Sequence, residues 1–180
     1  MSFDKACKTL FSFLIPLLIL DIVVKYWVAT SLPTFSWMHS YFPYGGIGLI
    51  NGYHGIYFSM VHTTNKGAAW GILADYQDYL LMGRMVLIGC LTIFILFINK
   101  NRSLVVPFCL IITGAIGNVL DYFLYGHVID MWNIQAWGYN FPIFNMADVY
   151  VTIGIVWLFF LFMFEKKKIK PPKDIDYSSY

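Results

Sequence analysis

Four long apolar stretches, separated by polar or aromatic segments, dominate the pattern of this chain. They cover about residues 10–29, 79–98, 104–125 and 144–164. A helix needs about 20 apolar residues to cross the roughly 30 Å hydrocarbon core of a bilayer, so each stretch is long enough. Only 12% of the residues are charged, against about 25% in soluble domains. We therefore predict an all-α membrane protein built as a four-transmembrane-helix bundle.

The segment between the first two stretches, residues 31–79, has a different pattern. It is rich in glycine and aromatic residues, and residues 52–64 combine tyrosine, phenylalanine, isoleucine, valine and paired threonines. These residue types favour strands, and aromatic side chains belong at membrane interfaces. We expect a small extracytoplasmic, β-rich platform on the outer membrane surface. Residues 126–143 are expected to form an outer loop.

The basic residues predict an orientation. With four spans, nine of the twelve lysines and arginines fall on one side: Lys5, Lys8, Lys100, Arg102, Lys166, Lys167, Lys168, Lys170 and Lys173. Cytoplasmic loops carry the excess of positive charge, so both termini are expected in the cytoplasm. Residues 1–165 then form a single membrane-embedded domain, and residues 166–180 form a basic cytoplasmic tail. The basic residues do not interleave with aromatic ones as in a nucleic-acid-binding surface, so no nucleic-acid partner is expected.

Several polar residues inside the spans suit structural roles. Asp21 and Lys25 are four residues apart, so they share a helix face and can form an ion pair. In the third stretch a helical stripe combines two glycines, an amide and an acid at Gly114, Gly117, Asn118 and Asp121. Small residues permit close contact between membrane helices, and amides can bond across them.

Two carboxylates suggest chemistry. Asp130 in the outer loop and Asp148 near the outer end of the fourth span are placed to meet at one depth, and Asn145 precedes Asp148 by one helical step. Two close carboxylates cannot both ionise easily, so they share a proton, as in aspartic proteases. The alternative is a solvated Asp130 and an Asp148 that only stabilises a helix N-terminus. His127, three residues before Asp130, suggests a metal site as another alternative. Only one histidine lies nearby, however, and this favours chemistry without a metal.

Five sequence pieces carry a family resemblance. They are Asp21-x-x-x-Lys25, Asn65-x-Gly67-Ala68-Ala69-Trp70-Gly71, Gly114-Ala115-x-Gly117-Asn118-x-x-Asp121, Val128-x-Asp130 and Phe144-Asn145-x-Ala147-Asp148. In this order and on four spans, the chain resembles the lipoprotein signal peptidases, or signal peptidase II, a family of aspartic membrane peptidases.

The resemblance implies a catalytic pair, Asp130 and Asp148, and no metal or organic cofactor. It implies a substrate site formed by Asn65, Gly67, Asn118, Tyr122 and Asn145. The implied substrate is a prolipoprotein with a diacylglyceryl-modified cysteine, cut on the N-terminal side of that residue. The expected protein is a monomer in contact with phospholipid, in the bacterial cytoplasmic membrane, with its active site at the outer face. Tyr122 is a departure, because the family usually has arginine there.

Two other classes of protein share part of this pattern. Intramembrane aspartates and asparagines also serve proton relays in transporters, so a small proton-coupled transporter or accessory subunit is the main alternative. Four spans without a repeated half make a transporter less natural. The other class is a structural membrane protein whose polar residues only hold helices together. Proteolysis of a lipidated precursor distinguishes the peptidase from both.

Overall fold

The computed structural model describes residues 3–36, 41–66 and 74–164, and its main elements are four helices. These are α1 (Phe3–Ser31), α2 (Gln77–Ile93), α3 (Val105–Tyr125) and α4 (Met146–Met163). A π-helical turn, Phe94–Ile98, continues α2, and short 3-10 turns at Ala74–Tyr76 and Arg102–Leu104 precede α2 and α3. All four helices are long and apolar enough to cross a membrane, so the prediction of four helices that can span it is confirmed.

The third helix is the centre of the bundle. More than half of the residues in its apolar segment are buried, and the helix packs against α1, α2 and α4. The other helices expose large apolar side chains, including Val86 on α2 and Phe159 on α4, as lipid-facing helices do. Helix α1 begins at Phe3, earlier than residue 10. Among the added residues, Ala6 and the two lysines, Lys5 and Lys8, favour helices, and lysines suit a membrane interface.

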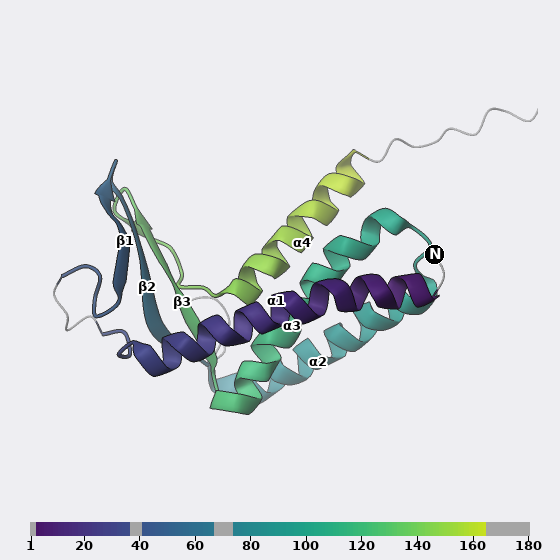
Figure 1. The fold of residues 1–180 in the computed structure, drawn as a ribbon, viewed down its shortest axis with the longest axis horizontal. Helices are drawn as coiled ribbons and strands as arrows, with labels where there is room; N and C mark the ends of the chain where they lie inside the picture. The colour runs from purple at the N-terminus through teal and green to yellow at the C-terminus, as the bar shows by residue number, and fades with distance from the viewer. Residues whose placement is uncertain (1–2, 37–40, 67–73, 165–180) are drawn as a thin grey trace, which may run out of the picture.

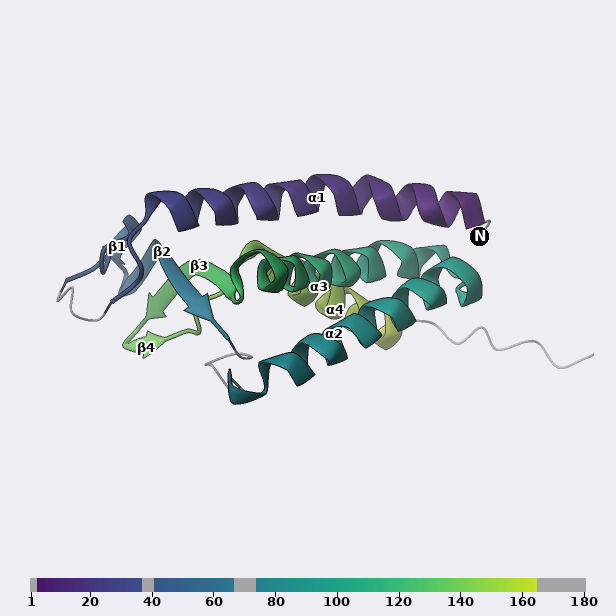
Figure 2. The same ribbon diagram turned by 90° about the horizontal axis from the view of Figure 1, so that it is seen from below.

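A four-stranded antiparallel sheet lies at one end of the bundle (Figures 1 and 2). Its order is β1 (Ile47–Tyr53), β2 (Ile56–Asn65), β3 (Val128–Ala136) and β4 (Tyr139–Asn140). The first two strands confirm that the segment between the first two helices is β-rich. The prediction of a loop over residues 126–143 was wrong, because this segment supplies β3 and β4.

Strand β3 forms because it has partners on both sides. It pairs with β2 from Ile56↔Ala136 to Asn65↔Val128. Its own sequence contains valine, isoleucine and tryptophan, which fit a pleated surface. Trp137 and Gly138, both with positive φ, then turn the chain into β4. The sheet therefore includes the segment that carries Asp130.

Glycines bring α3 and α4 into close contact. A Cβ atom on Gly114 would lie 2.2 Å from the carbonyl oxygen of Ala147, and one on Gly154 would lie 2.6 Å from that of Pro107. No side chain fits at these distances, so the two backbones approach as closely as small residues allow. This contact sets the first turn of α4, with Asp148, against the middle of α3. The stripe of small residues predicted a close helix contact, and the structure identifies α4 as the partner.

The elements near the sheet come from distant parts of the chain. Helix α1 ends there, α3 leads directly into β3, and α2 and α4 begin there, while the N-terminus and the connection between α2 and α3 lie at the opposite end (Figures 1 and 2). Polar side chains from β2, β3, α3 and α4 can therefore meet at the junction of sheet and bundle.

Candidate active site

Asp130 lies on β3 with its side chain buried, 3% exposed. The register pairs Thr63 with Asp130 and Asn65 with Val128. Side chains two residues apart on a strand point to the same face, so Asn65 is a diagonal neighbour of Asp130. The Nδ2 atom of Asn65 donates to Oδ2 of Asp130 over 3.0 Å.

Asp148 lies in the first turn of α4 and belongs to its N-terminal cap. Asn145 is the N-cap: its Oδ1 accepts from the Asp148 backbone N–H at 3.0 Å, and its own backbone N–H donates to Oδ2 of Asp148 at 3.2 Å. This reciprocal arrangement is a capping box, which satisfies two N–H groups that a helix start leaves without partners. The carboxylate thus has a structural role as well as a candidate chemical one.

A short β-bridge between Trp132 and Phe144 brings the cap of α4 to strand β3. The backbone N–H of Phe144 donates to the Trp132 carbonyl at 3.2 Å, and that of Trp132 donates back at 2.8 Å. Because Asn145 follows Phe144 directly, its side chain reaches β3, and its Nδ2 donates to Oδ1 of Asp130 over 2.7 Å. Asn145 is fully buried and holds both carboxylates in one place.

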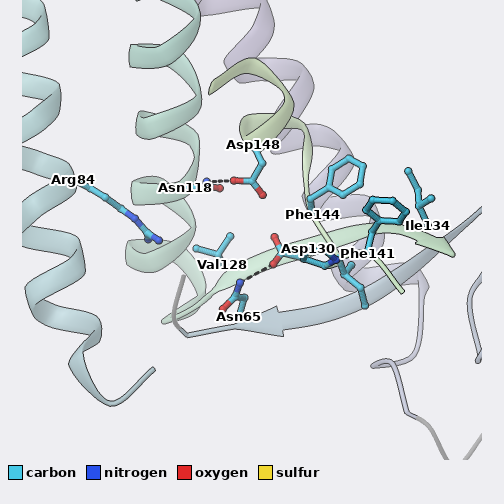
Figure 3. A pocket seen from close by; sticks show the side chains of 11 residues that line it. Asn65, Arg84, Asn118, Val128, Asp130, Ile134, Phe141, Phe144 and Asp148 are labelled. Carbon is cyan, nitrogen blue, oxygen red and sulfur yellow. Dashed lines mark hydrogen bonds between the residues drawn. The ribbon is translucent and has the colours of Figure 1, made fainter. Parts of the chain in front are cut away.

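Asn118 joins this network from α3. Its Nδ2 donates to Oδ1 of Asp148 over 2.8 Å (Figure 3). Its Oδ1 accepts from Asn145 over 3.1 Å. The structure therefore brings together five side chains that the sequence singled out: Asn65, Asn118, Asp130, Asn145 and Asp148. Every carboxylate oxygen of the two aspartates accepts at least one N–H group.

The environment of Asp130 favours its protonated form. Burial, followed by the nearby charge of Asp148, raises the pKa of Asp130 to about 7, although hydrogen bonds from Asn65 and Asn145 and the charge of Lys25 lower it. A carboxyl group with this pKa keeps its proton at mildly acidic pH. The two aspartates can therefore hold one proton between them near neutral pH.

A buried ion cluster lies next to the site. The Lys25 ammonium is fully buried and lies 2.8 Å from Oδ2 of both Asp21 and Asp121. Asp21 also accepts from the Ala147 backbone N–H at 3.0 Å, and Asp121 accepts from that of Ile129 at 3.1 Å. The cluster thus connects α1 and α3 to the start of α4 and to β3. It fits the structural role expected for these three charged residues.

Lys25 also sets the orientation of Asn118. Its Nζ donates to Oδ1 of Asn118 over 3.2 Å. An ammonium group only donates hydrogen bonds, so it selects the carbonyl end of the amide. The Nδ2 end of Asn118 must then face Asp148. The buried cation is in this way connected to a candidate catalytic carboxylate through a single amide.

A cavity of about 360 Å³ opens beside the two aspartates (Figure 3). Its polar lining consists of Asn65, Arg84, Asn118, Asp130 and Asp148; its apolar lining consists of Val128, Ile134, Phe141, Pro142, Ile143 and Phe144. The sequence did not single out the apolar side, although Val128 and Ile134 lie an even number of residues from Asp130 on β3 and so share its face. A mostly apolar cavity with a few convergent polar groups is typical of a binding site.

Two predicted site residues lie elsewhere. Tyr122 is not among the described residues that line the cavity; its hydroxyl donates to Oδ1 of Asp78 on α2 over 2.6 Å. Gly67 lies outside the described residues. Within the described part of the chain, no three histidine, cysteine, aspartate or glutamate side chains are placed to hold a metal ion.

Known proteins resemble this chain in both sequence and fold. The profile of the signal peptidase II family matches residues 13–164. The lipoprotein signal peptidase of Psychromonas ingrahamii is 32% identical over 164 residues, 87% of each chain, and that of Chlamydia felis is 38% identical over 118 residues, 64% of this chain and 72% of the relative. A bacterial membrane enzyme solved by the in meso method at 2.3 Å resolution superimposes with a TM-score of 0.76 and 28% identity, over 92% of this chain and 95% of the other.

Proposed function

This chain belongs to the signal peptidase II family, and we propose that it removes signal peptides from lipid-modified prolipoproteins as an aspartic endopeptidase. The cut lies on the N-terminal side of the diacylglyceryl-modified cysteine. One observation carries the catalytic assignment. Asn145 donates its side-chain N–H to Asp130 at 2.7 Å and its backbone N–H to Asp148 at 3.2 Å, which brings two carboxylates to one cavity.

The reaction uses the pair as acid and base. A water molecule between the aspartates loses a proton to the ionised carboxylate as its oxygen attacks the scissile carbonyl carbon. The protonated carboxyl donates its proton as the C–N bond breaks and the amine of the lipidated cysteine leaves. The pKa of Asp130, about 7, supports its role as the member that holds the proton at neutral pH.

The asparagines keep the two carboxylates in position. Asn118 and Asn145 donate to Asp148 and Asp130 respectively, and they are hydrogen-bonded to each other at 3.1 Å. Amides cannot titrate near neutral pH, so they orient the aspartates without competing for the shared proton. Such a preorganised network needs little rearrangement when the transition state forms.

The protein is a multi-pass membrane protein, and we place its sheet and active site at the outer face. The excess of lysine and arginine on the opposite side supports this orientation. In a bacterial cytoplasmic membrane, both termini then face the cytoplasm. One copy of the enzyme binds the precursor, and the signal peptide lies as a helix beside the bundle. The acyl chains on the modified cysteine stay among the phospholipids.

Cleavage of a defined precursor tests the proposal. Purified protein in lipid nanodiscs should cut a precursor with a diacylglyceryl cysteine, with a metal chelator present, and leave the unlipidated precursor intact. Mass spectrometry of the product should find the lipidated cysteine as its new N-terminus. Loss of cleavage with chelator would overturn the aspartic mechanism. Proton flux through reconstituted vesicles without any proteolysis would favour the transporter instead.

A further inference from the structure

Arg84 is a cation within a membrane-spanning helix. It and Asp78 are the charged residues of α2, and Arg84 lies in the apolar part of that helix. Its half-buried side chain points from α2 into the cavity that Asp130 and Asp148 line (Figure 3). Charged groups at membrane depth are costly and usually face a functional cavity. The catalytic mechanism above does not use this one.

The depth of Arg84 matches that of the site. Arg84 lies six residues beyond Asp78, roughly 9 Å along the helix at 1.5 Å per residue. Asn118 lies four residues before Tyr122, about 6 Å along α3. Since the hydroxyl of Tyr122 bonds to Asp78 and the two helices run in opposite directions, Arg84 and Asn118 are at similar depths.

Two hydrogen bonds hold α2 in this place. Besides the bond from Tyr122 to Asp78 at 2.6 Å, Nε2 of Gln77 donates to the carbonyl oxygen of Gly126 at 2.9 Å. Both connect the first turn of α2 to the end of α3. No residue of α2 between Gln77 and Ile93 is fully buried, and its apolar contacts with the core, through Ile88 and Leu91, lie in the second half of the helix. The polar contacts near its start therefore matter more.

The charge balance of the cavity selects a neutral ligand for Arg84. Asp130 and Asp148 together carry about one negative charge when they share a proton. A phosphate group beside Arg84 would add negative charge to a low-dielectric site that already holds a carboxylate. A guanidinium group donates hydrogen bonds and accepts none, so a carbonyl oxygen is a suitable partner.

The position of α2 identifies which carbonyl. The sheet side of the cavity is formed by β3 and by Phe141 and Phe144, whereas Arg84 enters from a helix that exposes Met85 and Val86. Under the proposed function the acyl chains stay in lipid, so the lipid portion of a substrate belongs on this lipid-facing side. We propose that Arg84 is a substrate-positioning residue that binds an ester carbonyl of the diacylglyceryl group. The hydrogen bond from Tyr122 to Asp78 holds α2, and with it Arg84, in place. This inference rests on the proposed function.

The test compares two precursors that differ only in those carbonyls. One carries a diacylglyceryl cysteine with ester linkages, and the other carries the dialkyl ether analogue. Arg84→Gln should raise KM for the diester roughly tenfold, as loss of a charge-assisted hydrogen bond predicts, with kcat within about twofold. The same variant should change KM for the diether little. Arg102→Gln, at the opposite end of the bundle, is the matched control and should leave both constants unchanged.

A second pair of variants tests the support from Tyr122. Tyr122→Phe and Asp78→Ala each remove the hydrogen bond, so each should raise KM for the diester, and neither should add its full effect to that of Arg84→Gln. Full additivity would overturn the part assigned to this bond. An equal loss on diester and diether, or a fall in kcat with KM unchanged, would overturn the role of Arg84.

Binding separates this inference from the proposed function. In an Asp148→Asn background, which should bind without cutting, Kd for the diester should rise with Arg84→Gln and Kd for the diether should not. If the wild type cuts neither precursor, the proposed function fails, and the Kd values still decide the role of Arg84. Equal Kd values for the two precursors, with and without Arg84, would overturn it.

Discussion

The ammonium group of Lys25 lies 3.2 Å from Oδ1 of the Asn118 side chain, and this contact turns the side-chain nitrogen toward Asp148. Lys25 is also the cation between Asp21 and Asp121, at 2.8 Å from each. A residue that appears in the sequence as half of an ion pair is therefore connected to the candidate catalytic site.

Lys25→Met should lower both stability and activity. Removal of one partner from a buried ion cluster leaves uncompensated charge, which costs about 3–5 kcal/mol. Thermal unfolding in detergent measures the loss, and Lys100→Met, an exposed lysine in the α2–α3 connection, is the control.

The triple variant Asp21→Asn, Lys25→Met, Asp121→Asn should recover stability because no charge is left unpaired, but kcat should stay low because Asn118 lacks its donor. Wild-type stability in Lys25→Met would contradict the cluster's role.

Replacement of either candidate catalytic aspartate should abolish most of the cleavage. Asp130→Asn and Asp148→Asn keep the size of the side chain and remove the ionisable group. General acid–base catalysis contributes roughly 10²–10⁴-fold, so kcat should fall by at least that factor. Single-turnover cleavage of the lipidated precursor measures it. Asp4→Asn, an exposed acid at the opposite end of α1, should cleave normally. Near-normal turnover in either site variant would exclude the aspartate pair.

Activity should fall as pH rises through the range in which Asp130 loses its proton. The pKa of Asp130 is about 7, raised mainly by burial. Above that pH Asp130 is ionised and no longer protonates the leaving amine. The pH profile of kcat/KM should therefore have an alkaline limb near pH 7. A profile that stays flat to pH 9 would show that Asp130 does not supply the proton.

The same raised pKa has a consequence for stability, with a defined sign. The folded protein binds a proton at Asp130 more tightly than the unfolded chain does, because aspartates in an unfolded chain have a pKa of about 3.9. The resulting stabilisation is present below that value and is lost as pH rises to about 7. The unfolding free energy of Asp130→Asn should therefore depend less on pH over this interval than that of the wild type.

Two glycine-to-alanine substitutions should have opposite outcomes. A Cβ on Gly114 would lie 2.2 Å from the Ala147 carbonyl oxygen, whereas one on Gly89 of α2 would meet nothing within 4 Å. Gly114→Ala must push α4 away from α3 and should cost about 1–3 kcal/mol, as overpacking does. It should also reduce kcat, because the Asn118–Asp148 bond spans the same contact. Gly89→Ala should cleave normally and unfold at or above the wild-type temperature. Equal behaviour of the two would contradict the close α3–α4 contact.

Labelling from one side of the membrane tests the orientation. In a variant with Cys7, Cys90 and Cys109 replaced by alanine, a cysteine at Tyr53 or Lys100 reports the two ends of the bundle. Both positions are exposed. A membrane-impermeant maleimide should label Tyr53→Cys in spheroplasts and Lys100→Cys only after lysis. Labelling of both from the same side would contradict the four-span arrangement.

Local sequence determined the helices of this protein. Apolar runs of about 20 residues are long enough to cross a bilayer whatever surrounds them, so four helices were predictable from composition alone. The stripe containing Gly114 predicted a close helix contact, because helical period is a local property and small residues have one common use in membrane helices. Asn145 and Asp148 were likewise readable as neighbours, three residues apart at a helix start.

The tertiary structure decided what pairs across distant segments. Asp130 was predicted in a loop, but β3 exists because β2, more than sixty residues earlier in the chain, supplies its partner. Strand pairing depends on such non-local contacts, which no local pattern contains. Asn65 faces Asp130 only through that register, and the hydroxyl of Tyr122 bonds to Asp78 only because α2 begins beside the end of α3. A polar side chain can reach any partner within its length, so its actual partner is settled when the helices and the sheet pack together.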